Sequence, residues 1–242
     1  MDKIRLVTLD MVGTVIRFRQ PPVSQYQRVA ATHGHNLDLK PLAASFKHQW
    51  VSMNKIYPHF GSTTEGMSSI VWWHQLVKNT FRDVMGDQYD DKSISQAASE
   101  LYSFYHSPKP YEVIDDGLEA LVTLKNNNLY VGAISNFDNR LHDIIPSLGL
   151  SKYLDFVVTS EDAKSSKPDQ KIFELAEKRS KLVNLKPSEV LHIGDDLDND
   201  YYGALNMCWN SLLVDRWGGG YTTIDEDQIV ENIMEIFQKK TF

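Results

Sequence analysis

Short apolar segments alternate with helical patterns along most of this chain, and this alternation sets its fold class. The segments rich in apolar residues are 4–9, 129–134, 156–158, 190–193 and 212–214. Short apolar strands separated by helices are typical of parallel sheets, because the helices then cover both faces of the sheet. The sequence therefore predicts an α/β fold with a parallel sheet at its core.

The alternation is interrupted after its first strand. Residues 24–106 show four helical patterns and no strand, and prolines flank this region on both sides. We therefore expect residues 20–108 to form a helical domain inserted into a core made of residues 1–19 and 109–242. A last helix is expected over residues 229–237.

Composition limits the partners that we expect this chain to bind and the cellular compartment in which we expect to find it. The formal net charge of −7 leaves no surplus of basic side chains to neutralise phosphates, which argues against nucleic-acid binding. No apolar run approaches the ~18 residues of a membrane span, and a strand that begins near Ile4 leaves no room for a cleavable leader. We expect a monomer in the cytosol or the nucleus. The single cysteine, Cys208, allows no intramolecular disulfide and is expected to be a buried thiol.

Polar motifs lie where ligands bind in such folds, at the carboxyl ends of parallel strands. They are residues 10–14 (Asp-Met-Val-Gly-Thr), 135–136 (Ser-Asn), 167–169 (Lys-Pro-Asp) and 194–200, which begins Gly-Asp-Asp. The first, second and fourth motifs follow predicted strands, and the third precedes a helix. We expect the sheet to bring all four together.

The residues in these motifs suit a covalent hydrolytic mechanism. Asp10 at a strand end can act as a nucleophile, and a covalent intermediate splits one difficult displacement into two easier ones. The Ser135 hydroxyl and the Asn136 amide can hold a phosphoryl oxygen. Lys167 can neutralise both the nucleophile and the transferring group. Asp10, Lys167 and Ser135 are therefore the predicted catalytic residues, and Ser135, Asn136 and Lys167 are also predicted to bind substrate.

Carboxylates in the first and fourth motifs suggest a metal site. Asp195 and Asp200 are five positions apart and can both face the site from a loop that enters a helix. Together with Asp10 they would repel one another without a cation, and Mg²⁺ prefers oxygen ligands of this kind. Eight histidines are present, but no pair has convincing zinc spacing with a third ligand, so we predict no zinc.

These four motifs, in this order, resemble the signature motifs of the haloacid dehalogenase (HAD) superfamily over essentially the whole chain. Residues 135–141 and the pair Trp72-Trp73 are similar to one subgroup of that family. The resemblance implies a Rossmann-like core, a helical cap of the C1 type, hydrolase activity on a small molecule, and Mg²⁺ as cofactor. It implies metal ligation by Asp10, by the main-chain carbonyl of Val12 and by Asp195, with Asp200 or Asp196 as an outer or alternative ligand. Gly13 and Thr14 belong to the implied substrate-binding motif, where Gly13 allows a sharp turn.

Val12 departs from the pattern of the family's phosphatases. Those enzymes usually carry an aspartate at this position, which protonates the leaving group and later activates water. General acid–base help is worth ~10²–10⁴-fold in rate, and valine cannot transfer a proton. We therefore expect weak activity on alkyl phosphates and less impairment on acyl or aryl phosphates, whose leaving groups are acidic.

Two other functions stay open at this point. Bacterial dehalogenases of the superfamily also lack that aspartate, and they work without Mg²⁺, so a 2-haloacid dehalogenase is one alternative. A catalytically silent protein that binds a ligand or partner is the other. The carboxylates at Asp195, Asp196 and Asp200 favour phosphoryl chemistry over carbon–halogen cleavage.

Each motif also has a simpler structural explanation. Ser135 and Asn136 can cap the helix that follows them, and Lys167 can be a solvated lysine. The acidic run can be a helix N-terminus favoured by the dipole. Asp138 and Arg140 are expected to form a local ion pair or cap.

Overall fold

The computed structural model describes residues 3–237, which divide into two compact units. The sheet unit consists of residues 3–17, 112–137 and 145–237. The helical unit consists of residues 18–111 and 138–144. The chain passes between the two units near residues 18 and 111, and segment 138–144 groups with the helical unit.

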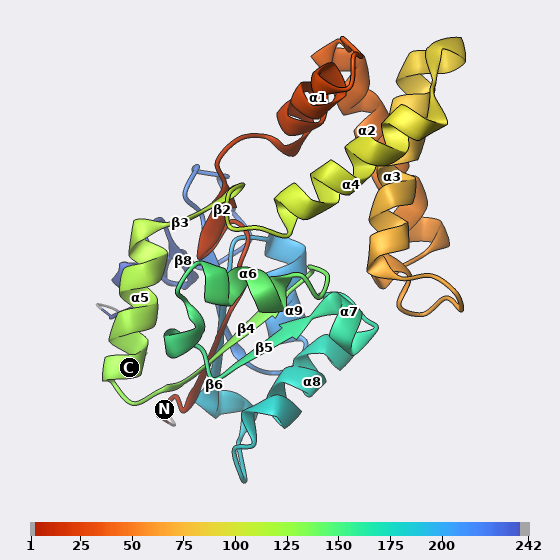
Figure 1. Ribbon diagram of the computed structural model, residues 1–242. Coiled ribbons are helices and arrows are strands. Elements are labelled where there is room, and N and C mark those ends of the chain that lie inside the picture. The colour runs from red at the N-terminus through yellow and green to blue at the C-terminus, as the bar shows by residue number, and fades with distance from the viewer. Residues whose placement is uncertain (1–2, 238–242) are drawn as a thin grey trace. The chain divides into compact units, whose positions relative to one another are not determined.

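Six parallel strands form the sheet, in the order β5-β4-β1-β6-β7-β8 (Figure 1). Their bounds are β1 Leu6–Leu9, β4 Tyr130–Ser135, β5 Phe156–Thr159, β6 Val190–Gly194, β7 Asn210–Val214 and β8 Ile229–Val230. Leu6 in the central strand β1 pairs with Tyr130 of β4 on one side and with Val190 of β6 on the other. The chain reverses its direction of progress across the sheet beside β1, and ligands bind at such a switch point in doubly wound folds.

Helices cover the sheet because its strands are apolar on both faces. The helices of this unit are α5 Asp115–Asn126, α7 Ser160–Ala163, α8 Gln170–Ser180 and α9 Gly203–Leu205, and α6 Leu141–Ser147 spans the unit boundary. α8 and α9 bury Ile172, Phe173 and Ala204 against Leu6, Ile134, Val158 and Val190 of the strands. α5 packs on the opposite side of the sheet (Figure 1).

Four helices make up most of the helical unit, as the sequence predicts. They are α1 Pro22–Thr32, α2 Leu39–Ile56, α3 Ser69–Met85 and α4 Asp91–Tyr105. Side chains at helical spacing, including Tyr26, Val29, Phe81 and Leu101, form one core. A second, aromatic cluster gathers Trp72 and Phe60 with Trp50 and Trp73 around them. The short strands β2 (Ile16–Phe18) and β3 (Tyr111–Val113) pair where the chain passes between the units.

Two expectations from the sequence are wrong. The helix predicted over residues 229–237 is instead strand β8 followed by a 3-10 helix, Ile233–Phe237, because Ile229 and Val230 extend the sheet beside β7. Cys208 is exposed rather than buried. It sits at φ +58° in the turn after α9, and the next residue, Trp209, takes the place in the core.

Candidate active site

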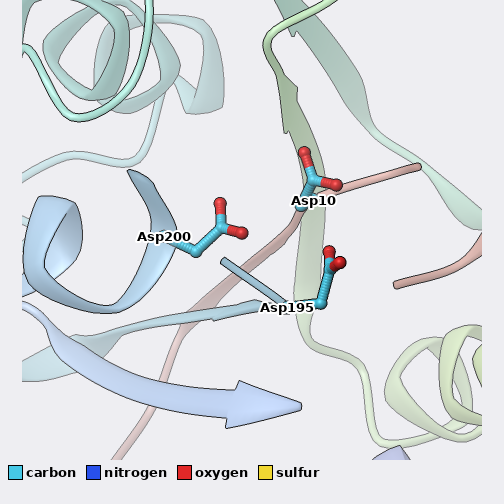
Figure 2. A group of neighbouring side chains, drawn as sticks. All are labelled: Asp10, Asp195 and Asp200. Atoms are coloured by element: carbon cyan, nitrogen blue, oxygen red, sulfur yellow. The ribbon is translucent and has the colours of Figure 1, made fainter. Parts of the chain in front are cut away.

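The predicted site residues meet at the carboxyl edge of the central strands. Asp10 directly follows β1, and its main-chain N–H donates to Ile193 of β6 (2.9 Å). Ser135 ends β4, and Asp195 directly follows β6. Carboxylate oxygens of Asp10, Asp195 and Asp200 lie within 4.8 Å of one another around a common space (Figure 2). The parallel register thus brings together groups that are far apart in the sequence.

Lys167 joins two of these carboxylates. Its Nζ lies 2.6 Å from Asp10 Oδ1 and 2.5 Å from Asp200 Oδ1, and it donates a third hydrogen bond to the carbonyl of Ile134 (2.8 Å). All three N–H donors of the ammonium group are therefore engaged. Lys167 is 4% exposed and Asp200 is 1% exposed, which excludes a solvated surface lysine.

Burial and neighbouring charges have opposing effects on the pKa values of these carboxylates and of Lys167. Burial raises the pKa of Asp10 to about 7, against the opposing charge of Lys167. Burial and the neighbouring Asp200 raise the pKa of Asp195. Burial alone would also raise the pKa of Asp200, but the charge of Lys167 holds it below its usual range. Burial disfavours the charged form of Lys167, yet the charges of Asp10 and Asp200 raise its pKa above the ordinary value.

The donor set fits a divalent cation. Three carboxylates face one ammonium group, so full ionisation leaves two negative charges uncompensated. All the candidate side-chain ligands are carboxylate oxygens, the donor type that Mg²⁺ prefers. Asp196 stands apart, because its Oδ1 caps the following helical turn by accepting from the N–H groups of Asp198 and Asn199. Asp10, Asp195 and Asp200 are the residues placed to hold a metal, and the Val12 carbonyl in the adjoining turn stays a prediction.

Gly13 and Thr14 shape the space that Asp195 occupies. Gly13 has φ +104°, and a Cβ there would lie 2.2 Å from Asp195 Oδ2. The buried Thr14 hydroxyl donates to Asp195 Oδ1 at 3.0 Å. Both residues therefore orient Asp195 in this structure, and a direct contact of either with substrate stays a prediction.

Ser135 and Asn136 have different surroundings. Among the described residues the Ser135 hydroxyl makes no hydrogen bond, which leaves it available to a substrate oxygen. The Asn136 side chain instead clamps the backbone of Lys167, since Oδ1 accepts from the Lys167 N–H (2.7 Å) and Nδ2 donates to its carbonyl (3.0 Å). Asn136 thus positions Lys167, and only its remaining amide hydrogen is left for a phosphoryl oxygen.

The expected ion pair between Asp138 and Arg140 is confirmed, and it belongs to the helical unit. Arg140 Nη2 lies 2.6 Å from Asp138 Oδ2, and Trp73 Nε1 donates to the same oxygen at 2.5 Å. The guanidinium also lies over the rings of Trp73 (4.6 Å) and Tyr102 (4.8 Å). These buried groups are structural, and they explain why residues 138–144 group with the helices.

Two polar residues beside the site were missed by the sequence reasoning. Thr8 and His192 are fully buried in the neighbouring strands β1 and β6, where they occupy directly paired positions. A signal was available, because each is a polar residue inside an otherwise apolar strand, where an unpaired polar group would be costly.

Comparison with known proteins assigns the family. The profile of haloacid dehalogenase-like hydrolases matches residues 4–207. The chain belongs to this family, and the fold and the predicted HAD resemblance agree with it. No helix within residues 3–237 has the length and apolar character that spanning a membrane requires.

Two relatives are similar in sequence to this chain over most of its length. The "Rhythmically expressed gene 2 protein" of Drosophila melanogaster is 33% identical over 250 residues, covering 99% of this chain and 96% of its own. "Haloacid dehalogenase-like hydrolase domain-containing protein 3" of Bos taurus, from the subgroup that residues 135–141 resemble, is 33% identical over 88% of this chain and 82% of its own.

Solved structures show the same fold at lower sequence identity. The magnesium-bound HAD-hydrolase YfnB of Bacillus subtilis has a TM-score of 0.70 at 14% identity, over 98% of both chains. A 2-haloacid dehalogenase of Pseudomonas syringae has a TM-score of 0.69 at 19% identity, over 97% of both.

Proposed function

We propose that this hydrolase is a Mg²⁺-dependent phosphatase that acts on a small phosphorylated metabolite through an aspartyl-phosphate intermediate. The observation that carries the proposal is that three carboxyl groups, those of Asp10, Asp195 and Asp200, lie together with a single ammonium group, that of Lys167. A dianionic phosphate could not enter such a site without a cation. The charge balance thus favours a site that takes up a metal together with a phosphate.

The side chains have separable roles in this reaction. Lys167 holds Asp10 Oδ1, which leaves the other carboxylate oxygen to attack phosphorus while the bond to the leaving group breaks. Ser135 donates its hydroxyl to an oxygen of the phosphoryl group, and Lys167 offsets the charge that develops there. Water then cleaves the aspartyl phosphate and restores Asp10. A Mg²⁺ held by Asp10, Asp195 and the Val12 carbonyl, with Asp200 as outer ligand, would neutralise the phosphate charge.

Val12 limits the substrates that suit this site. Without a carboxyl group at this position no side chain of residues 10–14 other than Asp10 itself and the Thr14 hydroxyl can exchange a proton, and that hydroxyl is bound to Asp195. Leaving groups that depart as stable anions need no protonation. We therefore propose an acyl phosphate or another phosphate with an acidic leaving group as the preferred substrate. The helical unit would act as the cap that selects it.

Phosphate release from acetyl phosphate and p-nitrophenyl phosphate tests the proposal, measured with and without Mg²⁺ beside an Asp10→Asn control. We expect Mg²⁺-dependent turnover that the control lacks. Absence of turnover above the control, in folded and metal-loaded protein, would remove the phosphatase proposal. If Mg²⁺ and inorganic phosphate still bound, a catalytically silent binding protein would be the better description.

A 2-haloacid dehalogenase is the second candidate, because a structural neighbour bears that name and Val12 lacks the carboxyl group that the family's phosphatases usually carry. The two are separated by their metal requirement. Chloride release from 2-chloropropionate that persists in EDTA would favour the dehalogenase, whereas phosphate release abolished by EDTA would favour the phosphatase.

A further inference from the structure

The core of the sheet contains a pair of polar side chains behind the catalytic lysine. Thr8 of β1 and His192 of β6 are both 0% exposed and occupy directly paired positions in neighbouring strands. Thr8 Oγ1 lies 2.8 Å from His192 Nδ1, and His192 Nε2 lies 3.1 Å from Asp200 Oδ1. The ring of Phe173 meets the imidazole edge-on at 5.5 Å. The imidazole is thus fixed on three sides.

Hydrogen-bond chemistry assigns the ring tautomer. The Asp200 carboxylate can only accept, so Nε2, which lies 3.1 Å from Asp200 Oδ1, carries a proton. In the neutral imidazole the second nitrogen, Nδ1, then accepts from the Thr8 hydroxyl at 2.8 Å. In functional histidines, the hydrogen bond made by one ring nitrogen commonly determines whether the other nitrogen carries the proton.

Hydrogen bonds connect the Thr8–His192 pair to the candidate active site. Asp200 Oδ1 accepts from both His192 Nε2 and Lys167 Nζ, and its Oδ2 accepts from the Asp196 N–H at 3.0 Å. Lys167 in turn reaches Asp10 Oδ1. Five side chains therefore form one buried sequence of contacts, Thr8–His192–Asp200–Lys167–Asp10.

We propose that His192 is a positioning residue for the hydrolase reaction: with its ring orientation fixed by Thr8, its Nε2–H holds Asp200 where Lys167 can reach the nucleophile. The kinetic part of this inference rests on the proposed phosphatase function. An apolar ring would fill the same volume and need no partner, whereas a buried imidazole needs a partner at each nitrogen. Both nitrogens are bonded here, and the partner of Nε2 is the Asp200 oxygen that also accepts from Lys167.

Three substitutions at one position separate positioning from packing. His192→Gln places an amide nitrogen at the ε position, so it can still donate to Asp200. His192→Asn has its amide at the δ position, near Thr8, and cannot reach Asp200. His192→Phe keeps the ring and its volume but has no donor. Positioning predicts that activity follows the ε donor, whereas packing predicts that the phenylalanine variant is the best of the three.

The first measurement is kcat and KM for acetyl phosphate with Mg²⁺, at a temperature where each variant is folded by circular dichroism. We expect kcat to fall about 10- to 100-fold in H192N and H192F, the usual loss for a supporting partner, and to be largely rescued in H192Q. A phenylalanine variant as active as wild type, or equal losses in all three, would overturn the proposal.

Two readouts need no turnover, and they separate failure of this inference from failure of the proposed function. Nitrogen-15 NMR of the histidine ring is expected to show protonated Nε2 and bare Nδ1, with the Nδ1 signal displaced in Thr8→Val and retained in Thr8→Ser. Crystal structures are expected to show Lys167 Nζ withdrawn from Asp10 in H192F and in place in H192Q. An unprotonated Nε2, or an unmoved Lys167 in H192F, would refute the positioning role even if wild-type protein hydrolysed no phosphate.

Discussion

At the scale of single residues, the burial of Asp10 ties its ionisation to the stability of the fold. Its pKa of about 7 lies above the value of 3.8 for an unperturbed aspartate, so the folded state holds the proton more tightly than the unfolded state. This contribution to stability is full below pH ~3.8 and is lost as pH rises through about 7.

Metal-free protein should therefore lose stability between pH 6 and pH 8, and Asp10→Asn should reduce that loss. At pH 8 we expect the variant to have the higher Tm, at ~2–4 °C per kcal/mol for a chain of this size. Thermal unfolding in EDTA at both pH values provides the measurement. Parallel pH profiles for the two proteins would contradict a raised pKa at Asp10.

Val12 offers a gain-of-function prediction. Val12→Asp should supply the missing proton transfer and raise turnover of an alkyl phosphate such as glycerol phosphate, by up to ~10²–10⁴-fold if the carboxyl group aligns. The effect on acetyl phosphate should be smaller, because its leaving group is already acidic. Val12→Asn is the matched control, since it adds similar polarity without an acid. A uniform change on both substrates would count against acid–base catalysis as the missing element.

Gly13 is predicted to be essential for metal binding through Asp195. In Gly13→Ala the new methyl group meets the Asp195 carboxylate, and φ +104° is strained for alanine as well. Gly34→Ala is a matched control, because Gly34 also has a positive φ (+88°) but has open space around its Cβ position. Calorimetric titration with Mg²⁺ should show affinity reduced about 10- to 100-fold in G13A and unchanged in G34A.

At the scale of elements, residues 138–144 depend on one buried ion pair. Arg140→Ala leaves Asp138 charged and without its guanidinium partner inside the helical unit, which should cost ~3–5 kcal/mol of unfolding free energy. The double variant Asp138→Asn/Arg140→Met should recover part of this loss. Arg17→Ala is the control, since its ion pair with Glu112 is largely exposed and such pairs contribute ~0–1 kcal/mol.

Urea unfolding followed by tryptophan fluorescence can measure these differences, because Trp50, Trp72 and Trp73 all report on the helical unit. Similar losses for Arg140→Ala and Arg17→Ala would mean that the buried pair does not hold the segment.

Most of the elements could be predicted from the sequence because their patterns are local. Strands β1, β4 and β6 are almost fully buried and mostly apolar, and the helices α1 to α4 carry apolar residues at helical spacing. The helix predicted over residues 229–237 is wrong because the apolar residues Ile229 and Val230 suit a helix or an edge strand equally. Pairing with β7 decides for the strand. Such pairing is a tertiary effect, which local patterns do not contain.

At the scale of the whole molecule, a metal that binds only the folded state should stabilise it. Mg²⁺ at 100 times its dissociation constant contributes ~2.7 kcal/mol. A thermal shift with increasing Mg²⁺ should therefore appear in wild type and be lost in Asp195→Asn. Equal shifts in the two proteins would place the metal elsewhere.

The sequence could predict which residues gather at the strand ends, but not their hydrogen-bond partners. Strand ends and residue chemistry predict a site of Asp10, Ser135, Lys167, Asp195 and Asp200. The structure brings the three carboxylates and Lys167 together, and the role of each residue stays a prediction. Which partner each side chain takes could not be predicted, because Asn136 and Thr14 engage Lys167 and Asp195 across gaps of 31 and 181 positions. Those contacts depend on exact placement, and so does the pair Thr8–His192.

The position of β1 at the centre of the sheet has a consequence for biosynthesis. Leu6 is made before both of its partners, because Tyr130 of β4 follows 124 positions later and Val190 of β6 follows 184 positions later. At ~5–20 residues per second, roughly 6–25 s pass before Tyr130 is made. Throughout that interval the apolar strand β1 has no neighbouring strand to join, while the helices of residues 18–111 can already fold. Residues 4–10 of the nascent chain are thus a segment that a chaperone could shield, and Asp10 acquires its buried surroundings only when the last acidic motif has been made.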